Sequence, residues 1–502
     1  MRCRRHELAV RATFLPPRAP DLRIPSGEKQ TPGLDPGRHT PRSAGAVAIP
    51  SLRALTSSRQ PRLRAGLLSF CAASLGRGVI MAAMRVDTLI VGGGVMGASI
   101  ALARARRTDP IAAPVLLLER RHFGAGSSGR SGAICRQFYS DRELIGMARD
   151  SLRDYASFET RHGRGIGFTR SGVLTIGGPS QPETLRLVER NAALMQECGA
   201  EVELVDARRM RALVPGMEVS DGALGAFEPD AGFVDPQRTV DALIAVARGA
   251  GATARAGVEV HELVLDGTRA RGVRTSDGDF ECERLVLAAG PWTRRLMQRA
   301  GVDLPLKVVR PEQHFLAMLP ERMRTRPKLS GAMDAEFDPR FAAASEPDPA
   351  HPVLLDIEHG YYTRCEPRRE RTRVGAMDYE RDHVLEDPDA LDEAVSPEFS
   401  AWSRDVLARR LPRYAQQPDA GTLAAWYTLT PDAQALIGRC PGLDNVLVVA
   451  GFSGHGFKLA PSVGEGVAQL LAGEPVGAFE PRFFDPARFV GSATGWGGAF
   501  GL

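Results

Sequence analysis

Residues 86–97 read VDTLIVGGGVMG, and this stretch decides the fold of the chain. Its apolar first half ends in glycines that have G-x-G-x-x-G spacing, and an Ala-rich stretch follows at 95–107. A second apolar run comes at 115–118. Strand, glycine turn, helix and strand make a βαβ unit, which predicts a parallel sheet that is buried on both faces.

The glycine turn predicts a dinucleotide-binding site. Gly92 allows a tight turn, Gly94 lets the backbone approach a pyrophosphate, and Gly97 lets the helix pack against the strand. Glu119 closes the second strand roughly 20 residues beyond Gly97, where an acid accepts hydrogen bonds from a ribose. This acid disfavours a ribose 2′-phosphate and therefore NADP. The alternative is a glycine-rich turn in some other α/β protein.

Further loops of small residues favour FAD over NAD. Two later apolar runs, 284–289 and 445–450, end in glycine and resemble more strands of the same sheet. Loops follow them at 288–292 (AAGPW) and 451–458 (GFSGHGFK), and a third lies at 124–129 (GAGSSG). A plain NAD domain needs only the first glycine turn. A helix that starts after the last loop would stabilise negative charge on a reduced flavin.

The expected fold class is α/β. It combines a Rossmann-like FAD-binding domain of the glutathione-reductase type with an inserted α+β substrate domain, whose sheet is mainly antiparallel. Short strands at 172–177 and 353–357 and an amphipathic helix at 183–199 suit the insert, and 334–351 suits a loop. The expected division is a basic, Pro-rich extension (1–84), FAD-binding segments (85–162, 223–307, 412–480), substrate-domain segments (163–222, 308–411) and a C-terminal tail (481–502).

Composition excludes several classes of protein. With 43% hydrophobic and 25% charged residues the chain is an ordinary globular protein. No run reaches the roughly 18 apolar residues that a spanning helix needs, so no integral membrane segment is expected. The seven cysteines form no CxxC pair and no metal-like spacing, which argues against a disulfide framework and a metal site. The expected location is the cytoplasm, or the mitochondrion if residues 1–84 are a targeting segment.

The charge is unevenly divided along the chain. Residues 1–84 hold 14 basic and 4 acidic residues, so the rest of the chain carries −6 although the total is +4. An acidic body makes nucleic acid a poor partner. The Arg-rich extension fits a targeting peptide, a disordered tail or upstream sequence joined by a mis-chosen start, and we favour the last interpretation.

Six motifs together resemble the FAD-dependent D-amino-acid oxidase family, in its sarcosine oxidase and dimethylglycine dehydrogenase-like branch. The resemblance runs from about residue 86 to 479 and is loose in the inserts. It implies an FAD-binding domain that is roofed by a sheet-based substrate domain. The motifs are VGGGVMG (91–97), ER (119–120), GSSGRSGAICRQFYS (126–140), FEPDAGFVDP (227–236), LAAGPW (287–292) and GFSGHGFKLAP (451–461).

The resemblance also implies a carboxylate clamp made of Arg136 and Lys458, which would be the catalytic and substrate-binding cations. Two fixed cations in a partly dry pocket bind a carboxylate strongly, and arginine does so bidentately. The alternatives are a surface arginine and a helix-start lysine. Tyr362 and Tyr427 match aromatic residues near the substrate, but each suits a core position equally well. The cofactor-binding residues implied are Gly92, Gly94, Val95, Met96, Gly97, Glu119, Arg120, Ser127, Ser128, Val258, Gly290, Trp292, Gly451, Gly454, His455, Gly456 and Lys458.

Departures from the family pattern refine these expectations. Ala425 stands where a cysteine tethers the flavin in monomeric sarcosine oxidases, and Ser127–Ser128 offers no histidine tether, so noncovalent FAD is expected. Arg373 stands at the place of a lysine that assists oxygen reduction, and Met377 at that of a substrate-side histidine. These two changes make direct use of O₂ doubtful. The electron acceptor is therefore left open among O₂, a quinone and a partner flavoprotein.

The expected function is oxidation of the C–N bond of a small amino or imino acid that is sarcosine-, N-methyl- or proline-like. An FAD-dependent oxidoreductase of this kind acts on CH–NH or CH–NH₂ donors by hydride transfer to flavin N5. The alternatives are a catalytic subunit of a multi-subunit amine dehydrogenase and a non-catalytic flavoprotein assembly factor. His455 suits a turn residue better than a base, and Cys135 a small buried residue better than a nucleophile.

Overall fold

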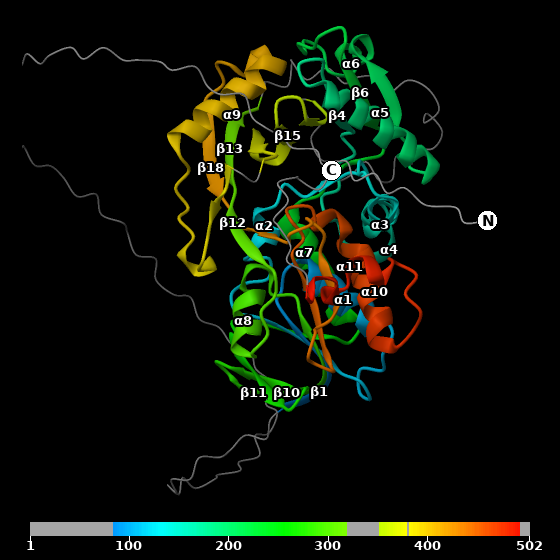
Figure 1. Cartoon of the computed structure of the whole chain (residues 1–502), viewed down its shortest axis with the longest axis vertical. Helices are drawn as coiled ribbons and strands as arrows, with labels where there is room; N and C mark the ends of the chain where they lie inside the picture. The colour runs from blue at the N-terminus through cyan, green and yellow to red at the C-terminus, as the bar shows by residue number, and fades with distance from the viewer. Residues whose placement is uncertain (1–83, 319–350, 379–380, 492–502) are drawn as a thin grey trace, which may run out of the picture. The chain divides into compact units, whose positions relative to one another are not determined.

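The computed structural model describes residues 84–318, 351–378 and 381–491 (Figure 1). The predicted extension, except Met84, and the predicted loop at 334–351, except its last residue, lie outside the described residues. So does the end of the predicted C-terminal tail, from residue 492. Among the described residues, no helix is both long and apolar enough to cross a membrane.

A first sheet contains the predicted βαβ unit and has the strand order β20-β21-β11-β1-β2-β8. Neighbouring strands from β21 to β8 are parallel, and β20 is antiparallel to β21. The apolar runs of the parallel strands place apolar side chains on both faces of the sheet, as a sheet that is covered on both sides requires. In β21, for example, all five residues are buried. The strands are β20 (Leu436–Arg439), β21 (Val446–Ala450), β11 (Gly278–Leu287), β1 (Met84–Val91), β2 (Val115–Glu119) and β8 (Thr253–Ala256).

Successive residues of these strands point into two different cores, because side chains alternate across a sheet. Ile90 and its neighbours pack against the helices α1 (Val95–Ala105), α7 (Pro236–Gly249) and α10 (Ala460–Ala472). Leu89 points to the opposite face, which the hairpin β9–β10 and helix α8 cover. That hairpin and helix are β9 (Val260–Asp266), β10 (Arg269–Thr275) and α8 (Thr293–Arg299).

A second sheet has the order β18-β13-β16-β15-β14-β4-β6-β5 and is antiparallel except for the pair β14–β4. This confirms the predicted α/β architecture with a mainly antiparallel second sheet. Two of its strands, β6 and β18, come from segments that the sequence-based division gave to the FAD-binding part. The strands are β18 (Asp419–Ala424), β13 (Glu312–Ala317), β16 (Arg371–Ala376), β15 (Tyr361–Glu366), β14 (Val353–Asp356), β4 (Val173–Gly177), β6 (Leu224–Glu228) and β5 (Glu203–Asp206).

The two faces of the second sheet differ in character. One face packs against α6 (Ala207–Leu213) and α9 (Pro397–Arg410) around residues such as Tyr361 and Val374. The other face turns toward the first sheet's core and contributes Tyr362 to it. In Figure 1, β13, β18 and α9 lie at one end of this sheet, and β4, β6, α5 (Pro182–Glu197) and α6 at the other.

Shorter elements complete the described chain. A two-stranded ladder joins β3 (Ile134–Cys135) to β7 (Gly232–Phe233), and helix α3 (Arg142–Ala156) follows β3. A three-stranded sheet has the order β17-β12-β19, with β17 (His383–Val384), β12 (Lys307–Arg310) and β19 (Tyr427–Leu429). In the predicted tail, α11 (Pro481–Phe484) packs against β20, and Phe484 is buried.

Candidate active site

A cleft opens where the strands β1, β2, β11 and β21 end. Val91, Leu118, Ala288 and Ala450 line it at these carboxyl ends, which is the edge where open α/β sheets bind their ligands. The segments that enter it come from distant parts of the sequence.

The glycine turn at the end of β1 has the geometry that its sequence predicts. Gly92 has φ +110°, and a Cβ there would lie 2.3 Å from the Ala288 carbonyl oxygen. A Cβ on Gly97 would lie 1.9 Å from the Gly92 carbonyl oxygen, so only glycine lets α1 approach the turn this closely. Gly94, the N-cap residue of α1, has no side chain to cap the helix, and the first residues of α1, Val95 and Met96, line the cleft. The turn therefore offers backbone N–H groups to an anionic ligand.

Glu119 occupies the predicted position at the end of β2. Its Oε2 accepts a hydrogen bond from Gly93 N at 2.8 Å, and its Oε1 accepts one from Arg121 N at 2.9 Å. Ser128 Oγ accepts from Val95 N at 2.9 Å. These contacts join the glycine turn to the end of β2 and to the 124–129 loop. The backbone N–H groups of the turn, with the Glu119 carboxylate, fit the pyrophosphate and ribose of an extended dinucleotide such as FAD.

Most of the residues predicted to bind the cofactor line this one cleft, whereas Gly97, His455 and Lys458 do not. Gly97 lies behind the turn. The lining residues among those predicted are Gly92, Gly94, Val95, Met96, Glu119, Arg120, Ser127, Ser128, Val258, Gly290, Trp292, Gly451, Gly454 and Gly456.

His455 turns away from the cleft. Its Nε2 lies 3.0 Å from the Ala433 carbonyl oxygen and its Nδ1 lies 3.4 Å from the Tyr139 hydroxyl. Burial, with the nearby charge of Lys458, lowers the pKa of the imidazole to about 3. The ring is therefore neutral and holds the loop in place, in line with the prediction of a turn residue rather than a base.

The two predicted clamp cations are buried together. Arg136 is 2% exposed and Lys458 is 7% exposed. Both approach the Tyr139 ring, whose centroid lies 4.6 Å from Arg136 Cζ and 5.9 Å from Lys458 Nζ. Arg136 Nη1 donates to the Phe138 carbonyl and Lys458 Nζ donates to the His455 carbonyl at 3.3 Å. Neither cation lines the cleft in this structure.

The two predicted tyrosines, Tyr362 and Tyr427, are joined by a side-chain hydrogen bond, and one of them reaches the cleft. Tyr427 lines the cleft and packs on Gly454, where a Cβ would lie 3.2 Å from the ring. Tyr362 is buried and covers Gly375, where a Cβ would lie 2.5 Å from the ring. Burial raises the pKa of the Tyr362 phenol, while Arg373 and a hydrogen bond with Tyr427 oppose this effect.

A buried ionic network on the second sheet holds the loop that follows α2 (Ser127–Arg130), and sequence reasoning missed it. Arg373 Nη1 donates to the Arg130 carbonyl at 3.0 Å, and Arg364 Nη1 donates to the Gly132 carbonyl. Glu366 accepts from both arginines, and they lower its pKa to about 2 although burial opposes this. The only signal in the sequence was alternation of charged residues along two strands.

An acidic contact at the mouth of the cleft was also missed. Asp389, in the 3-10 turn η6 (Pro388–Ala390), accepts from Arg120 Nη2 at 2.5 Å, Trp292 Nε1 at 2.9 Å and Arg295 Nη2 at 2.6 Å. All three donors line the cleft. These hydrogen bonds therefore hold the segment between β17 and α9 at the rim of the cleft.

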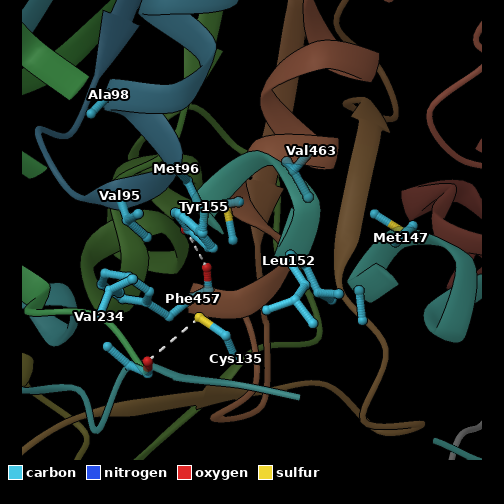
Figure 2. Close-up of a cluster of buried hydrophobic side chains, with 14 of the residues drawn as sticks. Val95, Met96, Ala98, Cys135, Met147, Leu152, Tyr155, Val234, Phe457 and Val463 are labelled. Carbon is cyan, nitrogen blue, oxygen red and sulfur yellow. Dashed lines mark hydrogen bonds between the residues drawn. The ribbon is translucent and has the colours of Figure 1, made fainter. Parts of the chain in front are cut away.

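Cys135 is a core residue. Figure 2 shows it beside Phe457 and Val234, near Tyr155, whose hydroxyl donates to the Phe457 carbonyl at 2.8 Å. Burial raises the pKa of the Cys135 thiol to about 12. A thiol that stays protonated is a poor nucleophile, in line with the predicted small buried residue.

Comparison with known proteins gives the family and the fold. Residues 87–470 match the family described as FAD dependent oxidoreductase. The chain is 29% identical over 418 residues to 4-methylaminobutanoate oxidase (formaldehyde-forming) of Paenarthrobacter nicotinovorans, covering 81% of this chain and 46% of that relative. It therefore spans about half the length of that relative. It is 25% identical to the human peroxisomal sarcosine oxidase, covering 76% of this chain and 91% of that protein.

The fold resembles that of L-proline dehydrogenase from P. horikoshii, with a TM-score of 0.69 at 22% identity, covering 81% of this chain and 98% of that one. The family match confirms the resemblance inferred from the motifs, and it supports an oxidoreductase that acts on CH–NH donors. The chain belongs to the FAD-dependent oxidoreductase family, and FAD is its cofactor.

Proposed function

We propose that the protein oxidises the C–N bond of a small secondary or tertiary amino or imino acid, with Arg136 and Lys458 holding the substrate carboxylate. Bound FAD supplies the hydride acceptor at N5. The chain's own residues bind the acid, orient its C–H bond toward the cleft and exclude water. Tyr362 and Tyr427, on the side of the second sheet, are proposed to border the substrate.

The observation that carries this proposal is the burial of Arg136 and Lys458 in one region, where no described carboxylate forms an ion pair with either. Among the described residues, neither Arg136 nor Lys458 forms an ion pair, and their hydrogen bonds go to neutral carbonyls. Two basic groups that share a buried site are costly unless an anion joins them or one of them gives up its proton. A substrate carboxylate is such an anion.

The same pocket favours a neutral substrate amine. Burial and the Arg136 charge lower the pKa of Lys458 well below its usual value. The same burial and positive charge disfavour a second cation beside them, so a bound substrate ammonium tends to release its proton. The neutral amine that results has the free lone pair that a hydride donor of this kind needs.

A dehydrogenase that passes its electrons to a quinone or a partner protein, as part of a larger amine dehydrogenase or alone, is the second candidate. The place where the family resemblance expects an oxygen-assisting lysine holds Arg373. Its guanidinium is committed to Glu366, Gln313 and the Arg130 carbonyl. Most of the N–H groups of this buried side chain are therefore already used within the protein, which disfavours a role in assisting O₂.

An anaerobic titration of the FAD-loaded protein tests the proposal. Sarcosine, N-methylated amino acids and proline are added in turn, and the flavin absorbance is followed. We expect bleaching with at least one of them, and then slow reoxidation in air if the acceptor is not O₂. A protein that binds FAD but is bleached by no carboxylated amine contradicts the proposal and favours an assembly factor.

A further inference from the structure

Glu228 anchors the segment that carries Arg136. It is the last residue of β6 and has no exposed surface. Its Oε2 accepts hydrogen bonds from Gln137 N at 2.6 Å and from Gln137 Nε2 at 3.3 Å. Because Gln137 follows Arg136 directly, this carboxyl group fixes the backbone from which the Arg136 side chain projects.

The second oxygen of Glu228 has no such anchor. Oε1 is buried and has no hydrogen-bond partner among the described residues. A fully buried, half-satisfied carboxylate is expensive, and the cost falls when the group takes up a proton. Burial raises the pKa of Glu228 to about 7, although the Gln137 backbone N–H and the Arg136 charge oppose the shift.

The other titratable groups around this pocket hold their charge state near neutral pH, apart from Lys458. Burial raises the pKa of Cys135 and of Tyr139 to about 12, and His455 has a pKa of about 3. Glu228 in turn raises the pKa of Lys458, opposing the effect of burial. Glu228 is therefore electrostatically coupled to the pair of cations without forming an ion pair with either.

We propose that Glu228 is a positioning residue whose protonation sets the charge of the pocket made by Arg136 and Lys458, so that its acid form favours, and its ionised form opposes, binding of the substrate carboxylate. This inference rests on the proposed function. Binding of an anion raises the proton affinity of Glu228, and by linkage the affinity for the anion falls as pH rises through neutrality. At low pH Glu228 is protonated and neutral, so the ligand meets the positive charge of Arg136 and Lys458 without an opposing carboxylate.

The test is the pH dependence of benzoate binding to the FAD-loaded protein, read from flavin absorbance between pH 6 and 8. Benzoate stays ionised throughout this range. We expect its affinity to fall roughly tenfold in the parent, the change given by one pKa unit of coupling. In Glu228→Gln, which keeps the acceptor for Gln137 N, the fall should be clearly smaller, and what remains belongs to Lys458.

Glu143→Gln is the matched control. Glu143 is a half-buried carboxyl group at the start of α3 whose pKa burial also raises, and it accepts from Glu480 N rather than from the pocket. This variant should keep the parental slope. Equal slopes in the parent and in Glu228→Gln overturn the role of Glu228 alone, whereas a parent that binds no carboxylate at any pH overturns the proposed function as well.

Infrared spectroscopy covers the case in which Glu228→Gln fails to fold. Addition of benzoate to the parent at pH 7 should increase the C=O band of a buried protonated carboxyl group, because the ligand draws a proton onto Glu228. Lys458 contributes nothing to that band. Benzoate binding without any increase in the band contradicts the proposal.

Discussion

At the scale of single residues, the protonation of Lys458 depends on whether an anion is bound beside it. Burial and the Arg136 charge both lower its pKa, and within the described ranges its Nζ donates to a neutral acceptor, the His455 carbonyl. An anionic ligand would supply the missing negative charge and restore the proton. Ligand binding and protonation at Nζ are therefore linked.

Replacing either cation should weaken carboxylate binding without loss of FAD. We expect Lys458→Met and Arg136→Met each to cost about 2–5 kcal/mol in benzoate affinity, the usual effect of truncating one partner of a buried charge pair. Flavin absorbance gives both the FAD content and the benzoate titration. Neither side chain lines the FAD cleft, so the cofactor should remain.

Arg142→Ala is the control for this pair of variants. Arg142 lies at the start of α3 and forms an exposed ion pair with Glu197. Exposed pairs contribute little, so benzoate affinity should stay within about 1 kcal/mol of the parent. If the clamp variants titrate benzoate like this control, the assignment of the clamp is wrong.

At the scale of elements, β15 and β16 act together through Glu366. This carboxylate accepts from Arg364, Arg371 and Arg373, and two of these arginines hold carbonyl groups of the loop after α2. The sheet therefore positions the loop through charged side chains rather than through backbone pairing. Removing the negative charge of Glu366 should therefore loosen both the cluster of arginines and the loop after α2.

We expect Glu366→Gln to lower the free energy of unfolding by about 3 kcal/mol and to weaken FAD binding. The pKa of Glu366 falls from 4.5 to about 2 on folding. A depressed carboxyl pKa contributes stability that is present above about pH 4.5 and is lost as pH falls through about 2. Urea unfolding at pH 7 and at pH 3 checks this. Between these two pH values the variant should lose less stability than the parent, because only the contribution of Glu366 is missing.

The exposed Glu370, in the turn between the same two strands, provides the control. Glu370→Gln should change the free energy of unfolding by less than about 0.5 kcal/mol. Equal stabilities of the Glu366→Gln and Glu370→Gln proteins would show that the network contributes nothing to the fold.

The contacts of Asp389, in the turn η6, lead to a separate prediction about the rim of the cleft. Asp389→Ala removes the acceptor shared by Arg120, Trp292 and Arg295. Because the contact is partly exposed, we expect FAD to bind about 1 kcal/mol more weakly and to dissociate several-fold faster. Transfer of released FAD to an excess of an apoprotein that binds FAD tightly, such as apo-glucose oxidase, gives the rate. Glu386→Ala, which removes an exposed acid on the same segment, should leave it unchanged.

At the scale of the whole molecule, noncovalent FAD stays a prediction that one experiment decides. Ala425 lines the cleft, whereas none of the cysteines in the described part of the chain does. Acid precipitation of the purified protein should therefore leave all of the yellow colour in the supernatant. Flavin that stays with the pellet would reveal a covalent tether.

Local sequence predicts much of this molecule because its parallel strands are short apolar runs that end in glycine. The predicted helix at 95–107 is α1, and the predicted strand at 445–450 is β21. The assignment of β6 and β18 to the second sheet was not foreseen, because it depends on pairing between distant strands rather than on local pattern. Which strands pair, and in which register, depends on the partner strand as well as on the strand itself.

The residues of the candidate site also fall into those that local sequence predicts and those that it does not. The glycine turn and Glu119 follow from a pattern whose spacing reports a backbone shape, and these residues line the cleft. Glu228 and Asp389 carry no such pattern. Their importance comes from burial and from donors that arrive from other segments, and no local feature of the sequence reports either.

The cleft also constrains how the protein acquires its cofactor during synthesis. Its floor combines β1 and β2 with β21 and the 451–458 loop, which leave the ribosome long after them. A nascent chain that already has its glycine turn still lacks the part of the cleft that β21 and the loop after it line. Stable flavin loading must therefore wait for the late segment, and polypeptides that terminate before residue 446 should be colourless and prone to degradation.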